Sequence, residues 1–245
     1  MLWNPAEKIL IIADGEVKRI SGLGVVDTAK LIGSKWGDEI SFGSKSYRML
    51  QISLEHAPEL IKRGPQIIRP HMGSLIVHNC DVSCGDIVVE GGAGSGMMSA
   101  ILNRAVGSEG RVHTYELRED HLRLARSNIS LLGLQDTWYP VIGDVTKDVE
   151  EKDVDAFILD IPEPWEALEM AHSCLKNGGH IAAYIPSMNQ MEKVYVDMRD
   201  NGFADVRAFE NIRRDMSVGK GNTRPAFEML GHTGYVVFGR KISSK

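Results

Sequence analysis

Strand-like and helix-like segments alternate regularly from residue 85 onward, and this alternation limits the possible folds more than any other feature. The β-branched run at 86–90 precedes a helical pattern at 96–106, and the run at 111–116 precedes an amphipathic segment at 119–132. Such alternation predicts parallel strands with helices packed on both faces of the sheet. We therefore expect an α/β protein with a Rossmann-like, doubly wound domain.

The same reading gives seven strands and further helices. The remaining expected strands lie at 138–142, 154–159, 179–184, 204–210 and 234–240, and the remaining helices at 165–175 and 188–200. The last two strands have no strong helical pattern between them, which is typical of an antiparallel pair at one edge. We expect a mostly parallel seven-stranded sheet.

The first part of the chain has a different pattern, with short strand-like runs separated by glycines. Asp14-Gly15 stands between the runs at 8–13 and 16–20, which indicates a hairpin. We expect a small β-rich domain at 1–59 and a catalytic domain at 60–245.

Composition excludes several classes of protein. With 245 residues, 43% of them hydrophobic, the chain can bury a full core, and its longest apolar runs are too short to span a bilayer. The N-terminus lacks the pattern of a secretory signal. Cys80, Cys84 and Cys174 form neither a disulfide framework nor a metal motif, so we expect small buried side chains and a reducing cytoplasm. The histidines are not spaced as ligands, and we expect no metal.

A glycine-rich run, EGGAGSG at 90–96, joins the first strand of this domain to its first helix. Gly92, Gly94 and Gly96 let the backbone turn sharply and approach a ligand closely. Counted from Gly92, the dinucleotide pattern GxGxxG would need glycine at position 97, where the chain has methionine. The pattern disfavours NAD.

Acidic residues then occur at the ends of three successive strands. Glu90 begins the glycine run, Glu116 ends the second strand, and Asp144 follows the third. S-adenosylmethionine carries an ammonium and a sulfonium and no phosphate, so carboxylates suit it. Glu116 stands where an acid reaches ribose hydroxyls, and Asp144 stands where one can accept from an adenine amino group. The sequence predicts a S-adenosylmethionine site.

Asp160 follows the buried fourth strand and precedes the prolines at 162 and 164, so its side chain is expected to project toward the crevice. If the acceptor is a ring nitrogen of adenine, a carboxylate that accepts from the N6 amine binds more strongly as the ring becomes cationic. Trp165 and Tyr184 are aromatic candidates for packing on a flipped base, or are core residues.

Several segments resemble the tRNA (adenine-N1)-methyltransferases of the TrmI type, which modify the T-loop. The most specific are DIPEPW at 160–165 and the late RP at 224–225 with GHTGY at 231–235. The glycine loop, PQI at 65–67, GDV at 143–145, LKNGG at 175–179 and YIP at 184–186 also match. The match begins near Gly22 and runs to the C-terminus.

The resemblance implies methyl transfer to N1 of adenine 58, or of both adenines 57 and 58, of tRNA by a homotetramer in the cytoplasm. It implies that Asp160 faces the adenine. The residues it places beside the cofactor are Ile68, Glu90, Gly92, Gly94, Ser95, Gly96, Met97, Met98, Glu116, His121, Asp144, Val145 and Asp160. Those it places beside the substrate are Arg69, Tyr184, Trp165, His232 and Arg224. Arg69 replaces an aromatic residue of the family, although a guanidinium can also stack on a base.

Two other functions stay open. The Pro-His-Met run at 70–72 also resembles protein isoaspartyl methyltransferases. In addition, paralogues within the TrmI-type family can be non-catalytic tRNA-binding subunits. The net charge of −5 argues mildly against a nucleic acid partner. Local basic groups could still contact phosphates, and they are Lys62, Arg63, Arg69, Arg207, Arg213, Arg214, Lys220 and Arg224.

Overall fold

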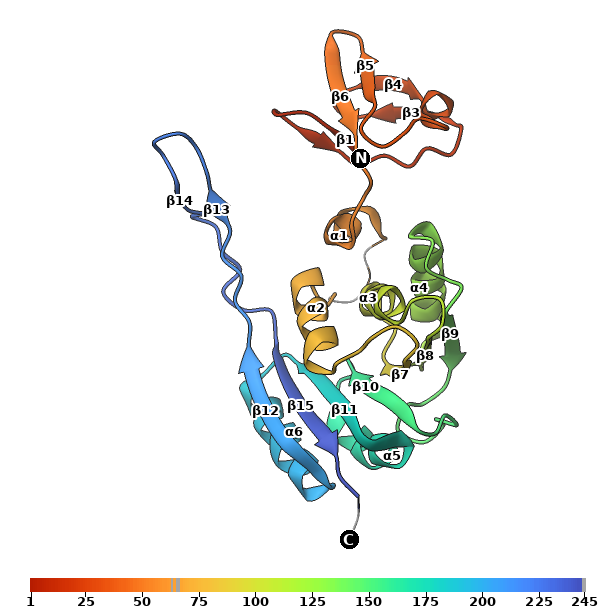
Figure 1. Ribbon diagram of the computed structural model, residues 1–245, viewed down its shortest axis with the longest axis vertical. Helices are drawn as coiled ribbons and strands as arrows, with labels where there is room; N and C mark the ends of the chain where they lie inside the picture. The colour runs from red at the N-terminus through yellow and green to blue at the C-terminus, as the bar shows by residue number, and fades with distance from the viewer. Residues whose placement is uncertain (63, 65–66, 244–245) are drawn as a thin grey trace. The chain divides into compact units, whose positions relative to one another are not determined.

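The computed structural model describes residues 1–62, 64 and 67–243. The chain divides into two compact units, Met1–Leu60 and Ile61–Lys245, which are described separately (Figure 1). In the described parts of the chain, no helix has the length and apolarity needed to cross a membrane.

The N-terminal unit consists of short antiparallel strands. One four-stranded sheet has the order β2-β1-β6-β5, and β3 and β4 form a separate hairpin. Leu2, Leu31, Tyr47 and Met49 form its buried core. The elements are β1 (Leu2–Trp3), β2 (Lys8–Ile9), β3 (Val17–Ile20), β4 (Gly24–Asp27), η1 (Thr28–Leu31), β5 (Glu39–Phe42), β6 (Lys45–Met49), η2 (Leu54–His56) and α1 (Ala57–Leu60).

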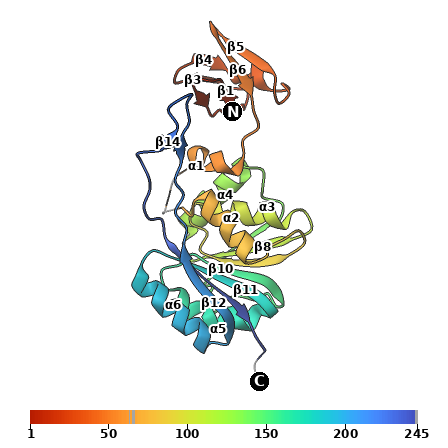
Figure 2. The ribbon, with the colours of Figure 1, turned by 60° about the vertical axis from the view of Figure 1, so that its left-hand side comes forward.

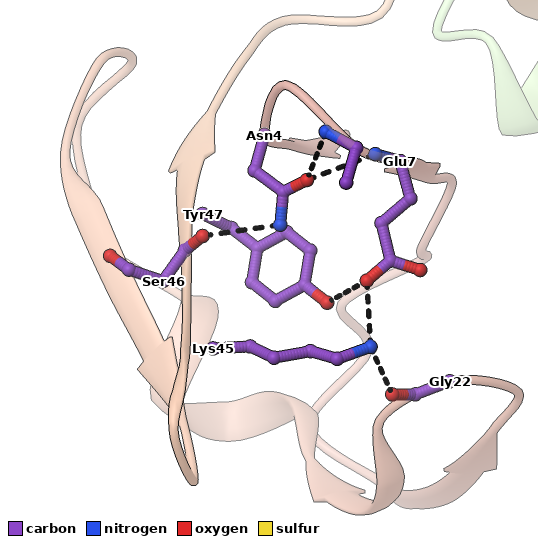
Figure 3. A network of polar contacts seen from close by, with 7 residues as sticks. Asn4, Glu7, Gly22, Lys45, Ser46 and Tyr47 are labelled. Carbon is purple, nitrogen blue, oxygen red and sulfur yellow. Dashed lines mark hydrogen bonds and ion pairs between the residues drawn. The ribbon is translucent and has the colours of Figure 1, made fainter.

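A polar network joins three segments of this unit (Figure 3). Glu7 Oε1 accepts hydrogen bonds from the Tyr47 hydroxyl at 2.6 Å and from Lys45 Nζ at 2.9 Å, and Lys45 also reaches the carbonyl of Gly22 at 3.5 Å. Asn4 accepts from the backbone N–H groups of Ala6 and Glu7. Because so small a core contributes little stability, these contacts help to fix the loops.

The hairpin expected around Asp14-Gly15 is wrong. β3 pairs with β4 instead, and β2 pairs with β1. Asp14 accepts from the Glu16 backbone N–H and pairs with Lys18. The chain does bend at Asp14 and Gly15, but the strand that follows, β3, pairs with β4 and not with the strand before the bend.

The C-terminal unit is built on a seven-stranded sheet with the order β12-β15-β11-β10-β7-β8-β9, in which β15 is antiparallel to both neighbours. This confirms the expected fold class and the antiparallel edge. The strands are β7 (Ile87–Gly91), β8 (Arg111–Glu116), β9 (Trp138–Ile142), β10 (Val154–Leu159), β11 (Leu175–Ile185), β12 (Phe203–Glu210) and β15 (Tyr235–Lys241). A small hairpin, β13 (Met216–Ser217) with β14 (Arg224–Pro225), lies in the segment between β12 and β15 (Figure 1), and Figure 2 shows β14 from another side.

Helices cover both faces of this sheet (Figure 1). Along a strand, successive side chains point to opposite faces. Val88 and Ile158 accordingly pack with α2 (Pro70–Asn79), α3 (Met97–Val106) and α4 (Glu119–Leu131), whereas Val89 and Leu159 pack with α5 (Leu168–Cys174) and α6 (Met188–Asp200). A 3-10 turn, η3 (Pro164–Ala167), precedes α5.

Three details differ from expectation. The helix α2 was not predicted from the sequence. β11 begins at Leu175, with a register shift against β10, whereas the sequence predicted a strand that starts only at residue 179. Cys84 is exposed, whereas Cys80 and Cys174 are buried as expected.

Candidate active site

Four polar side chains lie on the same face of the large sheet. Glu90, Thr114 and Glu116 have the same strand parity as Val88 and Val112, which pack under α2, α3 and α4. Asp160 continues the parity of Ile158 just beyond β10, and its backbone N–H donates to the carbonyl of Gly91 at 2.9 Å. The carboxyl ends of these parallel strands therefore gather acids at one place, as is typical of ligand sites in such sheets.

The glycine loop turns in conformations that favour glycine. Gly92, Gly94 and Gly96 have φ values of 93°, 50° and 80°. A Cβ at Gly92 would lie 2.2 Å from the carbonyl oxygen of Asp160, whereas a Cβ at Gly94 would meet nothing within 4 Å. The loop therefore packs on Asp160 at one glycine and leaves room for a ligand at another.

Glu90 is buried and points toward α3 and β8. Its Oε2 accepts from the hydroxyls of Ser99 at 2.5 Å and Thr114 at 2.7 Å, and Trp138 Nε1 donates to Thr114 Oγ1 at 2.7 Å. Glu90 Oε1 is buried without a partner among the described residues. Burial raises the pKa of Glu90 to about 8, against the two hydroxyl hydrogen bonds, and the charges of Asp160 and Glu116 add to the rise.

Glu116 binds the glycine loop directly. Its Oε2 accepts from the backbone N–H groups of Ala93 at 3.1 Å and Gly94 at 3.3 Å, and Oε1 accepts from that of Arg118 at 3.0 Å. His121 Nδ1 lies 3.7 Å from Oε2. The structure thus brings together Glu116, His121 and the loop, three of the expected cofactor contacts.

Asp144 makes contacts of a different kind. Its Oδ1 accepts from the backbone N–H of Thr146 at 3.0 Å and from its hydroxyl at 2.7 Å, and Oδ2 lies 3.0 Å from Lys147 Nζ. The Thr146 hydroxyl makes the largest contribution to lowering the pKa of Asp144. Asp144 thereby stabilises the turn after β9, and the adjacent Val145 is buried against Gly91.

Asp160, like Glu90, is a buried carboxyl group whose pKa is strongly raised. Burial raises its pKa to about 7, and the charge of Glu116 adds to the rise. No described residue donates a hydrogen bond to its carboxylate, so the group can accept from a ligand. A carboxyl group with a pKa near neutrality is a common sign of a functional site.

The two aromatic candidates lie in different places. Tyr184 is buried on the face that it shares with Asp160. Burial is the main cause that raises the pKa of Tyr184. The charge of Asp160 adds to this rise, and the charge of Arg69 opposes it. Trp165 packs in the cluster on the opposite face, with Lys193 Nζ 4.8 Å from its ring centroid. The structure therefore brings Tyr184, but not Trp165, onto the face that carries Asp160.

The late motif residues also differ in their surroundings. His232 contacts Glu210, the carbonyl of Pro186 and the ring of Tyr235. Arg224 lies in β14 with its guanidinium 3.7 Å from the centroid of the Phe227 ring. Arg224 is thus on the β13–β14 hairpin and His232 is at the end of the main sheet.

Sequence reasoning missed Asn128. This buried α4 residue donates to the carbonyls of Ser95 at 2.9 Å and Lys62 at 3.0 Å, and accepts from the Lys62 backbone N–H at 2.9 Å. It ties the glycine loop to the segment before α2. The one available signal was a polar residue beside the apolar face that contains Ala125 and Ile129. Three other expected cofactor contacts, Ile68, Met97 and Met98, have buried side chains, which therefore pack in the protein interior.

The expected basic residues are partly paired. Arg207 pairs with Asp205 and Arg213 with Asp215, and Arg63, like Pro65 and Gln66 of the matching motif, lies outside the described residues. Among the residues that the structure describes, no group of three His, Cys, Asp or Glu side chains could hold a metal ion.

The site combines a loop cradle, a concentration of carboxylates and the start of α3. The first backbone N–H groups of a helix lack intrahelical partners and carry partial positive charge. A ligand with a cationic part and a carboxylate would compensate both features.

Comparisons with known proteins agree with this chemistry. The family model of the tRNA methyltransferase complex GCD14 subunit matches residues 53–223. The chain is 30% identical to the tRNA (adenine(57)-N(1)/adenine(58)-N(1))-methyltransferase TrmI of Methanocaldococcus jannaschii, covering 89% of this chain and 86% of the relative.

Two solved structures have the same fold over most of their length. A SAM-dependent O-methyltransferase from Thermotoga maritima gives a TM-score of 0.90 at 32% identity, covering 100% of this chain and 92% of that one. The tRNA (m1A58) methyltransferase TrmI from Aquifex aeolicus gives 0.80 at 27% identity, covering 94% and 90%. The chain therefore belongs to the TrmI-type family of tRNA (adenine-N1)-methyltransferases, which the GCD14 model describes.

Proposed function

We propose that this protein transfers a methyl group from S-adenosylmethionine to N1 of adenine in the T-loop of tRNA, at position 58 or at both 57 and 58. One observation carries the proposal: Asp160, a carboxylate free to accept a hydrogen bond, is joined by its own backbone to the glycine loop. The acceptor site and the cofactor site would then be neighbours, as direct methyl transfer requires.

The residues present fit S-adenosylmethionine. Glu116 would accept from ribose hydroxyls while keeping its hydrogen bonds to the loop, and the open side of Gly94 would admit the ligand. The cofactor's carboxylate suits the backbone N–H groups that begin α3. Its positive charges would relieve the mutual repulsion of Glu90, Glu116 and Asp160, which helps to raise the pKa values of Glu90 and Asp160.

Bound S-adenosylmethionine supplies an electrophilic methyl group, and the protein's task is to present the acceptor. Adenine N1 is neutral before transfer and the ring is cationic after it. Asp160 would accept a hydrogen bond from the N6 amine, and this bond strengthens as charge develops. Tyr184 lies on the same face and could contact the base. Asp160 thus stabilises the transition state electrostatically.

Two further proposals concern partners. Segment 211–234, which includes the β13–β14 hairpin, carries exposed apolar residues at Ile212, Met216, Val218, Phe227, Met229 and Leu230. Exposed apolar groups of this extent suit a protein interface, which supports the homotetramer. The exposed Lys62, Arg69 and Lys220 could contact tRNA phosphates.

A competition between acceptors tests the proposal. Methyl-labelled S-adenosylmethionine is supplied with unmodified tRNA and an isoaspartyl peptide in separate and mixed reactions. We expect label on tRNA alone. Label on the peptide alone would favour the isoaspartyl methyltransferase, and tRNA binding without label would favour a non-catalytic subunit.

A further inference from the structure

His232 occupies a junction of three strand ends. Its Nδ1 lies 2.6 Å from Oε1 of Glu210, the last residue of β12, and its Nε2 lies 3.1 Å from the carbonyl oxygen of Pro186, just beyond β11. The ring centroid lies 4.8 Å from that of Tyr235, the first residue of β15. Both ring nitrogens therefore face oxygen acceptors.

This arrangement favours the charged imidazole. A neutral histidine has one N–H and could donate to Glu210 or to Pro186 but not to both, whereas the imidazolium donates to both. Glu210 is the charged partner, Pro186 contributes a carbonyl dipole, and Tyr235 contributes a neutral ring. The Glu210 hydrogen bond, followed by that of Pro186, raises the pKa of His232.

The two residues after His232 hold Tyr184. The Tyr184 hydroxyl donates to the backbone carbonyl of Thr233. Gly234 packs on the same ring, because a Cβ there would lie 2.4 Å from Tyr184 Cζ. A segment of three residues is thus fixed to the end of β11 by His232 on one side and by Tyr184 on the other.

Tyr184 in turn belongs to the surroundings of Asp160. Both lie on the face covered by α2, α3 and α4, and Leu159 pairs with Ala183 in the parallel register of β10 and β11, so Asp160 and Tyr184 are the next residues along these neighbouring strands. Displacement of segment 232–234 would therefore release the Tyr184 hydroxyl. It would leave the glycine loop and Glu116 in place, since these are joined by their own hydrogen bonds.

We infer that His232, hydrogen-bonded to Glu210 and Pro186, is a positioning residue that fixes Tyr184 beside Asp160 through Thr233 and Gly234. The inference rests on the proposed function, because it takes Asp160 as the group that faces the acceptor. In this role His232 touches neither substrate nor cofactor. It acts on the acceptor side of the site alone.

The test compares His232→Ala and Glu210→Gln with His172→Ala. His172 is a matched control because its Nε2 also contacts a backbone carbonyl, that of Ile242 at 3.2 Å, but it belongs to α5 on the other face. We expect kcat with tRNA to fall up to about 100-fold in His232→Ala, with cofactor affinity unchanged. The control should keep wild-type values. Unchanged kcat in His232→Ala, or an equal loss of cofactor affinity, would overturn the inference.

The pH dependence provides two readouts, and the first, an NMR titration, needs no turnover. NMR titration of the wild-type protein should give a His232 pKa above the ordinary value, and Glu210→Gln should return that pKa toward the ordinary value without removing the ring. The kcat of the wild type should decline as pH rises through the His232 pKa, and His232→Ala should lack this decline. A His232 resonance that titrates at the ordinary value, or the same kcat profile in both proteins, would contradict the inference. If the protein does not methylate tRNA, the NMR shift still appears, so failure of the proposed function is recognised separately.

Discussion

The backbone N–H of Asp160 donates a 2.9 Å hydrogen bond to the carbonyl of Gly91, so the peptide that carries the proposed acceptor-binding group is joined to the start of the glycine loop. The contact is made again one residue later, where Gly92 packs on the Asp160 carbonyl. The cofactor loop and the acceptor site are thus held together by direct backbone contacts between the ends of β7 and β10. Changes on either side are expected to affect the other.

Gly92→Ala tests this connection directly. A Cβ at Gly92 would lie 2.2 Å from the Asp160 carbonyl oxygen at a φ of 93°, so the loop and Asp160 cannot both keep their positions. We expect a loss of stability of about 1–3 kcal/mol and loss of methyl transfer. Thermal unfolding and cofactor titration calorimetry measure the two effects.

The control is Gly94→Ala, which has room for the methyl group. It should cost about 1–2 kcal/mol for its left-handed conformation and should weaken cofactor binding because the methyl group enters the proposed ligand space. If Gly92→Ala and Gly94→Ala lower the rate of methyl transfer equally at saturating cofactor, the proposed connection between Gly92 and Asp160 is contradicted.

Asp160→Asn should make the protein more stable at high pH. The pKa of Asp160 rises from an ordinary 3.8 to about 7 on folding. The folded state then binds more protons than the unfolded state between these values, so wild-type stability falls as pH rises through that window. Asparagine removes this cost, and we expect a gain of about 1–3 kcal/mol at pH 8 and little gain at pH 4, with methyl transfer lost. Denaturant unfolding at both pH values measures the gain.

Asp120→Asn is the control, and its effect on stability is expected to have the opposite sign to that of Asp160→Asn. Arg118 lowers the pKa of Asp120 to about 2, so its charge favours folding above that pH and its replacement should not stabilise the protein. An Asp160→Asn protein that is less stable than wild type at pH 8 would show that the Asp160 carboxylate is not desolvated.

Asn128→Ala should loosen the glycine loop from a distance. The substitution removes one buried and two partly buried hydrogen bonds and leaves the carbonyls of Ser95 and Lys62 without this partner. We expect a loss of about 2–4 kcal/mol and weaker cofactor binding. Asn201→Ala, which removes an exposed hydrogen bond to the Asp197 carbonyl, should stay within about 0.5 kcal/mol. Unchanged cofactor affinity in Asn128→Ala would count against a role in positioning the loop.

Binding of tRNA should weaken steeply with salt if basic side chains contact phosphates. Replacement of Arg214 or Lys220 by alanine should reduce the slope of log K against log salt by about 1 each. Arg199, exposed on α6, is the control and should leave the slope unchanged. Filter binding over a salt series measures the slopes, and salt-insensitive binding would exclude this role.

The positions of the acids could be predicted from the sequence because strand ends are marked by local patterns. Glu116 ends one strand and Asp160 follows another, and both strands are visible as apolar, β-branched or aromatic runs in the residues themselves. Strand parity then decides which face a side chain occupies, and it put Tyr184 on the face of Asp160. These features depend on neighbours in sequence.

Contacts between distant segments could not be predicted in this way. Trp165 follows Asp160 closely in sequence, yet the 3-10 turn that begins at Pro164 leads it to the opposite face. Asn128 owes its role to Lys62, which lies 66 residues away. The hairpin predicted at Asp14-Gly15 is wrong for the same reason. The bend there is a local feature, but the pairing of β3 with β4 depends on residues farther along the chain.

The identity of the methylated atom tests the central claim most directly. N1 lies on the Watson–Crick edge of adenine, so methylation there blocks base pairing and stops primer extension at that nucleotide. Unmodified tRNA is incubated with the protein and S-adenosylmethionine. One part is digested for nucleoside mass spectrometry, and another part serves as the template for primer extension. We predict N1-methyladenosine and an extension stop at position 58, or at 57 and 58, with wild-type protein, and loss of both with Asp160→Ala. Methylation at another atom, or near-normal N1 methylation by Asp160→Ala, would contradict the account.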